Sequence, residues 1–149
     1  MEESENPEKG SVEFVALLSE AWSAIERRLN GNLGAVRGIT YSEYRVLSAI
    51  AAGAAIGSSR AELGRAVGLS ASAVTRALRP LERLGMVVTA KHERDARLAI
   101  TRLTADGKEL VSDATGVVSD VMADIEDLTP SLKDHRNAIL AILAELGRG

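Results

Sequence analysis

The feature that most constrains the fold is a pair of short amphipathic segments joined by a turn of about three residues. A capping box at Ser59-Arg60-Ala61-Glu62 opens the first segment, which runs through Val67. Gly68 suits the positive φ with which a helix often closes, and Ser70 fits the N-cap of the next helix. That helix buries an aliphatic stripe and stops at Gly85. This is the spacing of a helix-turn-helix unit.

Two β-branched runs follow directly. The first covers Met86–Thr89, and the second covers Leu98–Thr101. The charged segment Lys91–Arg97 between them cannot belong to a core, so we expect a hairpin with a polar, mostly cationic tip. A helix-turn-helix followed by a basic hairpin is a winged helix. The predicted fold class is therefore mainly α with a small β-hairpin wing.

Long amphipathic helices flank this lobe. Apolar residues recur with helical period over residues 11–29, and we expect Gly31 and Gly34 to end that helix. A capping box at Thr40 and Glu43 opens the next helix, and Thr104 caps a long helix over residues 105–128. Thr129 and Pro130 suit the start of a last helix over residues 131–146. We expect a disordered acidic tail at residues 1–10, dimerisation helices at 11–35 and 104–149, and a winged helix-turn-helix DNA-binding lobe at 40–103.

The flanking helices predict a homodimer. Their broad apolar faces would leave large exposed patches on a single copy, and packing on a second copy removes them. A two-fold dimer presents two recognition helices about 34–36 Å apart, one turn of DNA, so we expect a pseudo-palindromic site on double-stranded DNA.

Charge supports this interpretation. The whole chain carries a net charge of −3, but residues 58–102 contain nine basic and four acidic residues. A basic middle between acidic ends is typical of a DNA-contacting element on an acidic body. Charge alone favours the simpler interpretation, that the basic residues form solvated helix faces.

The residues expected to meet DNA lie opposite the buried stripe of the second helix. Arg76 is placed to contact a guanine in the major groove, and Arg79 to contact phosphate. Ser72 and Thr75 are small enough for close approach, although either can be an ordinary solvent-facing residue. Pro80 lies inside this helix and is expected to kink it, either as tolerated irregularity or to set its entry angle.

At the tip of the hairpin, Arg94-Asp95-Ala96-Arg97 is the informative group. An arginine on a thin β-loop can enter a narrow minor groove, where the negative potential is strong. Asp95 can hold Arg97 by a charge-assisted hydrogen bond, or it can simply bond its own turn backbone.

Residues 69–87 resemble the recognition-helix region of the multiple-antibiotic-resistance regulator (MarR) family. Asp95-Ala96-Arg97 and the later Leu103-Thr104-Ala105-Asp106-Gly107 resemble that family's wing signature and the start of its next helix. The resemblance covers residues 11–147. It implies a homodimeric winged-helix transcription factor, usually a repressor, with Ser70, Ser72, Thr75, Arg76 and Arg79 on the groove-facing helix and Asp95 and Arg97 on the wing.

The resemblance also implies an effector pocket between the dimerisation helices and the lobe. Trp22, Tyr41 and Tyr44 border that junction and, with Phe14, are the only aromatic residues. They are candidates to bind a small aromatic or phenolic effector, and plain core packing is the favoured interpretation for any one of them. Peroxide-sensing members of the family use a reactive cysteine, and this chain has none.

Other function classes fit poorly. Without cysteine, disulfides and thiolate metal sites are excluded, and a cytoplasmic location is expected. His92 and His135 have no evident nucleophile or metal partner, and no phosphate-binding glycine loop is present, so we expect neither an enzyme nor a cofactor or metal. No apolar stretch is long enough to span a membrane. A metal-sensing repressor, and a winged helix used only for protein contacts, are the remaining alternatives.

Overall fold

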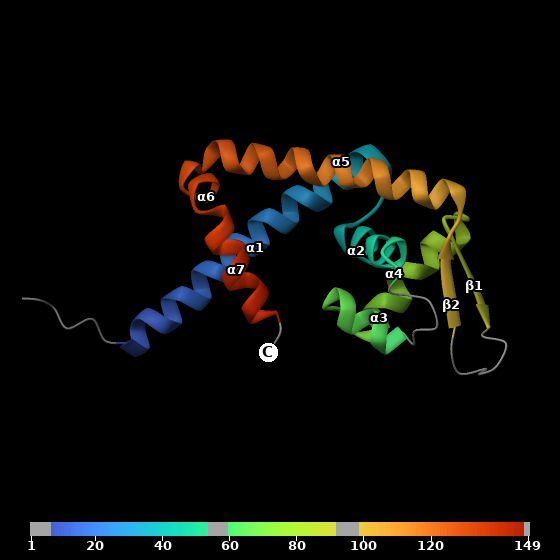
Figure 1. Ribbon diagram of the computed structural model, residues 1–149, viewed down its shortest axis with the longest axis horizontal. Coiled ribbons are helices and arrows are strands. Elements are labelled where there is room, and N and C mark those ends of the chain that lie inside the picture. Colours follow the sequence, from blue (N-terminus) through green and yellow to red (C-terminus); the bar gives the residue numbers. More distant parts are fainter. Residues whose placement is uncertain (1–6, 54–59, 92–98, 148–149) are drawn as a thin grey trace, which may run out of the picture.

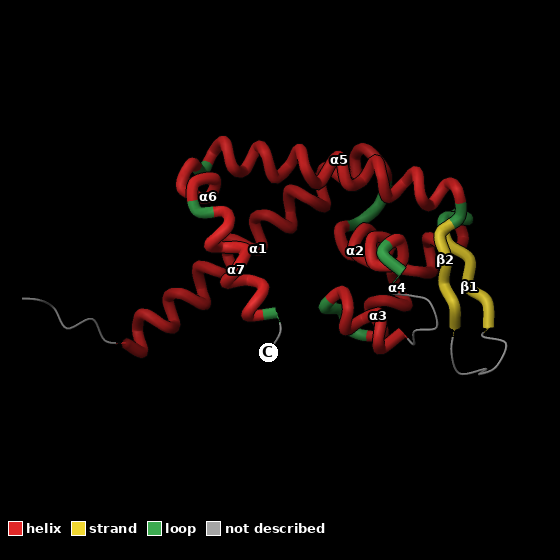
Figure 2. Tube along the Cα trace, in the orientation of Figure 1, coloured by secondary structure: helices red, strands yellow, loops and turns green. Residues whose placement is uncertain are grey.

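The computed structural model describes residues 7–53, 60–91 and 99–147. It has an elongated arm and a rounded lobe (Figure 1). The arm consists of α1 (Pro7–Arg37), α5 (Ala105–Leu128), α6 (Pro130–Asp134) and α7 (Arg136–Leu146). The lobe consists of α2 (Tyr41–Ala51), α3 (Arg60–Val67), α4 (Ala71–Arg83), β1 (Val87–Lys91) and β2 (Ala99–Leu103). Helices dominate the described part of the chain, with one antiparallel strand pair at the edge of the lobe (Figure 2). The predicted fold class is confirmed.

The core lies inside the lobe. Buried aliphatic residues from α2, α3, α4 and β1 form one cluster, which the C-terminal part of α1 and the middle of α5 complete through Leu33 and Ala114. Both residues are fully buried. The arm is therefore joined to the lobe by packing, and the lobe's interior is not closed by its own elements alone.

Local capping signals place several elements where the sequence predicted them. Thr40 and Glu43 form the expected capping box of α2. The Ser70 hydroxyl accepts a hydrogen bond from the Ala73 N–H at the start of α4, and the Thr104 hydroxyl accepts one from the Gly107 N–H at the start of α5. Gly68 and Gly85 have the expected positive φ, at 62° and 71°. The capping box at Ser59 lies outside the described residues.

The first helix differs from its prediction at both ends. It begins at Pro7, so it overlaps the expected tail at residues 1–10, and it continues through Gly31 and Gly34 to Arg37. Leu29 and Leu33 on the same helix are 2% and 0% exposed, so tertiary packing outweighs the cost of two helical glycines. Gly38, with φ 67°, is the residue that closes the helix.

The C-terminal helix and the strands also differ from their predictions. The expected helix over residues 131–146 is divided at His135, whose backbone N–H and Nδ1 both lie against the Ser131 carbonyl. Pro130 occupies the expected first helical position, but Thr129 makes no side-chain capping bond. Both strands extend about two residues further than their predicted C-terminal ends, with Thr89 paired to Thr101.

Candidate nucleic-acid interface

Helix α4 is strongly two-sided. Val74, Leu78 and Leu81 are at most 1% exposed and hold one face against the lobe's core. The opposite face is open, because Ala71, Ser72, Arg76 and Arg79 are all exposed. The helix continues through Pro80 to Arg83. Its accessible face therefore combines short side chains at the N-terminal end with two guanidinium groups one turn later, as a major-groove contact requires.

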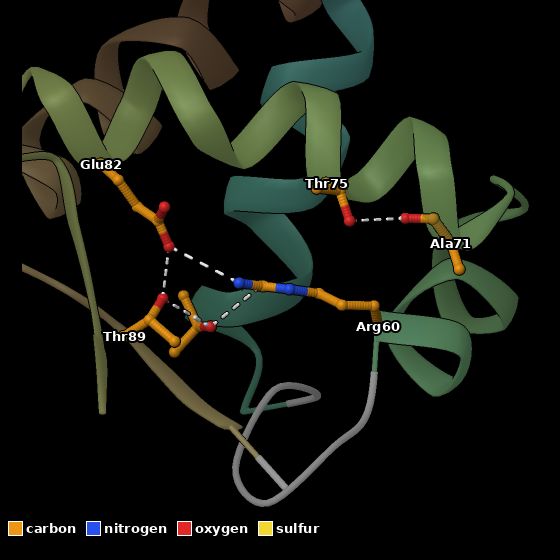
Figure 3. A network of polar contacts seen from close by, with 6 residues as sticks. Arg60, Ala71, Thr75, Glu82 and Thr89 are labelled. Carbon is orange, nitrogen blue, oxygen red and sulfur yellow. Dashed lines mark hydrogen bonds and ion pairs between the residues drawn. The ribbon is translucent and has the colours of Figure 1, made fainter. Parts of the chain in front are cut away.

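The hydroxyl groups at the start of α4 are already used by the helix. Ser70 accepts from the Ala73 N–H at 3.2 Å, and its Oγ lies 3.0 Å from that of Ser72. Thr75 is half-buried and donates its hydroxyl proton to the Ala71 carbonyl at 3.0 Å (Figure 3). Ser70 is therefore a capping residue first, and Thr75 can offer DNA only an acceptor oxygen while this bond persists.

The two arginines of this face are differently placed. Arg76 borders a pocket of about 260 Å³ between α4 and the start of α2, together with Thr40, Ser42 and Glu43. Arg79 lies three residues further on, towards the C-terminal end of the helix. Among the residues that the structure describes, neither arginine makes an ion pair or a hydrogen bond. Both guanidinium groups are therefore available to an external partner.

The stem of the hairpin stands beside α4. Val87 of β1 is buried in the core, and Val88, the next residue, is 56% exposed, as the alternation of a half-buried strand requires. Arg102 on β2 is also exposed and adds a positive charge at the edge of the lobe. The predicted wing contacts Arg94, Asp95 and Arg97 lie outside the described residues.

The three aromatic residues expected to bind an effector lie together. The ring centroids of Trp22 and Tyr41 are 5.8 Å apart, and those of Tyr41 and Tyr44 are 6.0 Å apart in a stacked arrangement. The guanidinium carbon of Arg45 lies 5.8 Å from the centre of the Tyr41 ring. Trp22 is 42% exposed, so one side of this aromatic cluster is open to solvent.

Two polar contacts fix the cluster in place. The Asn30 side chain accepts a hydrogen bond from the Tyr41 backbone N–H at 2.8 Å, which ties α2 to α1. The Thr115 hydroxyl donates to the Val111 carbonyl at 2.7 Å, so at its 3.2 Å contact with Tyr44 the phenol is the donor. Burial raises the pKa of the Tyr41 hydroxyl above its usual value, and the positive charge of Arg45 opposes that shift.

Sequence reasoning missed one polar network. Arg60, Glu82, Thr89 and Thr101 come together between α3, the C-terminal half of α4 and the strand pair (Figure 3). The period-2 pattern of the strands indicates that Thr89 and Thr101 can pair, but no local signal connects them to Arg60 or Glu82. These two charged side chains were counted only as part of the lobe's overall charge.

Comparison with known proteins supports the resemblance to the MarR family. A family model described as MarR family matches residues 37–98, which include α2, α3 and α4. The matched part of the winged-helix lobe is similar to the MarR family. The resemblance inferred from the sequence is thereby confirmed, and the chain is a DNA-binding transcriptional regulator. No family of enzymes is indicated. A search of curated proteins found no match.

Solved structures extend the likeness to the arm. The transcriptional regulator BldR from Sulfolobus solfataricus superposes with a TM-score of 0.79 at 18% identity, covering 94% of this chain and 99% of BldR. A mutant MarR from E. coli complexed with operator DNA gives 0.76 at 23% identity, with 95% and 98% covered. The Mycobacterium tuberculosis MarR family protein Rv2887, in complex with salicylic acid, gives 0.68 at 24% identity, with 85% and 93% covered.

Two properties of the described residues bear on other functions. Within residues 7–53, 60–91 and 99–147, no helix is long and apolar enough to cross a membrane. The same part of the chain contains no group of three or more histidine, aspartate or glutamate side chains arranged to hold a metal ion.

Proposed function

We propose that this chain is a homodimeric, ligand-responsive repressor that binds a pseudo-palindromic operator through α4 in the major groove and the hairpin in the minor groove. The observation that carries the proposal is the free face of α4, where Arg76 and Arg79 are exposed opposite a fully buried stripe. The E. coli MarR mutant that shares this fold was solved with operator DNA, and another similar structure, the transcriptional repressor CouR, was solved with a 23-mer duplex.

Exposed apolar side chains support a dimer. Val12, Phe14, Leu17 and Leu18 on the first half of α1 are between 45% and 71% exposed. Helix α7 has no buried residue, and four of its aliphatic side chains are 49% to 61% exposed: Leu140, Ile142, Leu143 and Leu146. Exposed apolar side chains on both α1 and α7 favour a partner molecule that buries them. A second copy of the chain is the partner that also supplies the second recognition helix for a two-fold operator.

The aromatic cluster of Trp22, Tyr41 and Tyr44 supports an effector of the aromatic acid or phenol class. Its stacked rings offer an apolar face, and Arg45 offers a positive charge within reach of a carboxylate. The cluster lies where α1 meets the lobe, so a ligand there can change the angle between the arm and α4. Rv2887, which shares the fold, was solved with salicylic acid. Such a ligand would release DNA by stabilising an arrangement in which the two α4 helices no longer match the operator.

The test is quantitative binding to a duplex that covers the promoter region of the protein's own gene. Arg76→Ala should remove discrimination at one base position in each half-site, a change of about 1–3 kcal/mol. Arg79→Ala should weaken binding to all sequences and lower the salt slope by about 1. Lys108→Ala, which removes an exposed charge from α5, is the control and should change neither quantity.

Two results would contradict the proposal. If Arg76→Ala lowers the affinity for every base-substituted duplex by the same factor, α4 does not read bases. If the wild-type protein binds no duplex at low ionic strength, the DNA-binding role itself fails. The same titration with salicylate added tests the effector, because a ligand-responsive repressor loses operator affinity as the ligand concentration rises.

A further inference from the structure

Four side chains from α3, α4, β1 and β2 form a polar network where these elements meet. Arg60 is the first residue of α3, and Glu82 is near the end of α4. Thr89 and Thr101 face each other across the strand pair. Figure 3 shows the extended Arg60 side chain crossing from α3 towards Glu82 and the strands. We call these four residues the hairpin clamp.

The contacts of the hairpin clamp close a ring. Arg60 donates from Nη1 to the Thr101 hydroxyl at 3.3 Å, and its Nη2 lies 3.5 Å from Glu82 Oε1. Thr89 donates to the same Glu82 oxygen at 2.6 Å. The two threonine hydroxyl oxygens are 3.2 Å apart. Each side chain therefore contacts two others, and the guanidinium spans both the helix and the strand sides of the ring.

The protons in this ring have one consistent arrangement. A threonine hydroxyl has a single proton, and Thr89 uses its proton on the Glu82 carboxylate. Thr101 must therefore be the donor in the contact between the two threonines, and its own oxygen accepts from Arg60. All bonds then run in one direction, from the guanidinium through Thr101 and Thr89 to the carboxylate. Charged groups at both ends polarise every bond in the same sense, which strengthens each of them.

Thr101 makes this ring costly to open. Its exposed fraction is 2%, and among the described residues it is the only polar or charged residue that is buried. A buried hydroxyl that loses its partners keeps its desolvation cost. If Arg60 moved away, the Thr101 hydroxyl would lose its donor. If Glu82 moved away, the Thr89 hydroxyl would lose its acceptor. The hairpin and the two helices are therefore held to one relative position.

We propose that the hairpin clamp is a positioning device, which fixes the stem of the hairpin against the C-terminal half of α4 so that both can contact DNA together. The role in DNA contact rests on the proposed function, whereas the contacts that hold the hairpin exist in the protein without DNA. Val87 anchors the base of the hairpin in the core, and Thr89, two residues further towards the tip on the same face, is the next point of attachment. Because β1 is attached at both Val87 and Thr89, the hairpin cannot tilt about a single point of contact with the lobe.

The experiment compares Thr101→Val, which removes the hydroxyl at nearly constant shape, with Thr101→Ser, which keeps it. We expect Thr101→Val to weaken DNA binding about tenfold and to lower the slope of log affinity against log salt by about 1 or more, since contacts to phosphate are lost when the hairpin tilts. Thr101→Ser should retain the wild-type slope. A loss of stability alone lowers the active fraction and leaves the slope unchanged, so the slope separates positioning from folding.

A second measurement needs no DNA. Amide hydrogen exchange of β1 and β2 in the free protein should become about tenfold faster in Thr101→Val and stay at the wild-type rate in Thr101→Ser. Ser23→Ala, which removes another bonded hydroxyl on α1, is the control and should change neither the salt slope nor exchange in the strands. Unchanged strand exchange in Thr101→Val would overturn the clamp, as would an unchanged salt slope. If the wild-type protein binds no DNA, the proposed function fails, and the exchange rates still decide the clamp.

Discussion

At the scale of single residues, polar side chains near α4 divide into those the protein uses internally and those it leaves open. Ser70 and Thr75 are bonded within the helix and its cap. Glu82 is bonded to Thr89 and Arg60 within the hairpin clamp. Arg76 and Arg79 have no such partner among the described residues. This division explains why the two arginines, and not the hydroxyl groups beside them, are the strongest candidates for direct contact with DNA.

Tyr41 gives a prediction about stability at alkaline pH. Burial raises the pKa of its hydroxyl, so the folded state holds the proton more tightly than the unfolded state. The resulting stability is fully present below the unfolded pKa of about 10. It is lost as the pH rises through the higher folded value, because only the unfolded chain gains by ionising. The free energy of unfolding should therefore fall above pH 10 in the wild type.

Urea unfolding at several pH values above and below 10 measures this effect. Tyr41→Phe should have a lower dependence on pH than the wild type, since it has no proton to lose at this position. Tyr44→Phe removes a smaller contribution to the raised pKa of Tyr41 and leaves the burial of Tyr41 in place, so this variant is the comparison and should keep more of the wild-type dependence than Tyr41→Phe. Equal pH dependence in wild type and Tyr41→Phe would show that Tyr41 is not the responsible group.

At the scale of elements, sequence reasoning succeeded where the signal is local. The caps at Thr40, Ser70 and Thr104 bond residues only three positions away, and all three form as the sequence predicted. The ends of α1 were wrong because its glycines are held by packing against residues distant in sequence, which a propensity argument does not include. The contact of Arg60 with Thr101 spans 41 positions and leaves no periodic pattern. The exposed face of α4 could be predicted from the helical spacing of its apolar residues alone.

The turn between α3 and α4 depends on a glycine that the sequence analysis did not single out. The Leu69 N–H donates to the Gly64 carbonyl at 2.8 Å, so the chain folds back tightly on α3. A Cβ at position 64 would collide with the Leu69 carbonyl oxygen, which is backbone and cannot rotate away. Gly64 is thus required by the close approach of two backbone segments, although its own position is helical.

We expect Gly64→Ala to destabilise the protein by about 1–3 kcal/mol, because the turn must shift to admit the methyl group. Gly116→Ala is the matched control on α5, where a Cβ meets nothing within 4 Å. That change should stabilise the protein by roughly 0.5–1 kcal/mol, as alanine does in an open helical position. Urea unfolding followed by circular dichroism measures both. Equal effects of the two substitutions would show that the turn at Leu69 tolerates a side chain.

At the scale of the whole molecule, the lobe and the arm differ in how completely they bury their apolar residues. The lobe has a continuous core, which α1 and α5 complete. Further along the arm, burial ends: every described residue from 11 to 24 is exposed, and α7 has no buried residue. In the described chain, apolar side chains are therefore buried in the lobe and left exposed on the part of the arm that is far from the lobe. A partner that covers the arm would also set the distance between two copies of α4, which ties assembly to operator recognition.

This argument predicts the effect of a charge placed on the arm. Leu17 and Leu143 are 58% and 49% exposed, and in a dimer that covers them each leucine contributes up to roughly 1.5–3 kcal/mol. The double variant Leu17→Glu with Leu143→Glu should therefore weaken dimerisation at least about tenfold in sedimentation equilibrium, since each interface gains buried carboxylates. Affinity for a full operator should fall with it, while affinity for an isolated half-site stays at the wild-type value.

Leu84→Glu, at an exposed leucine at the end of α4, is the control and should leave the oligomeric state unchanged. A wild-type protein that sediments as single copies, or a double variant that dimerises as tightly as the wild type, would mean that these faces of the arm have another partner.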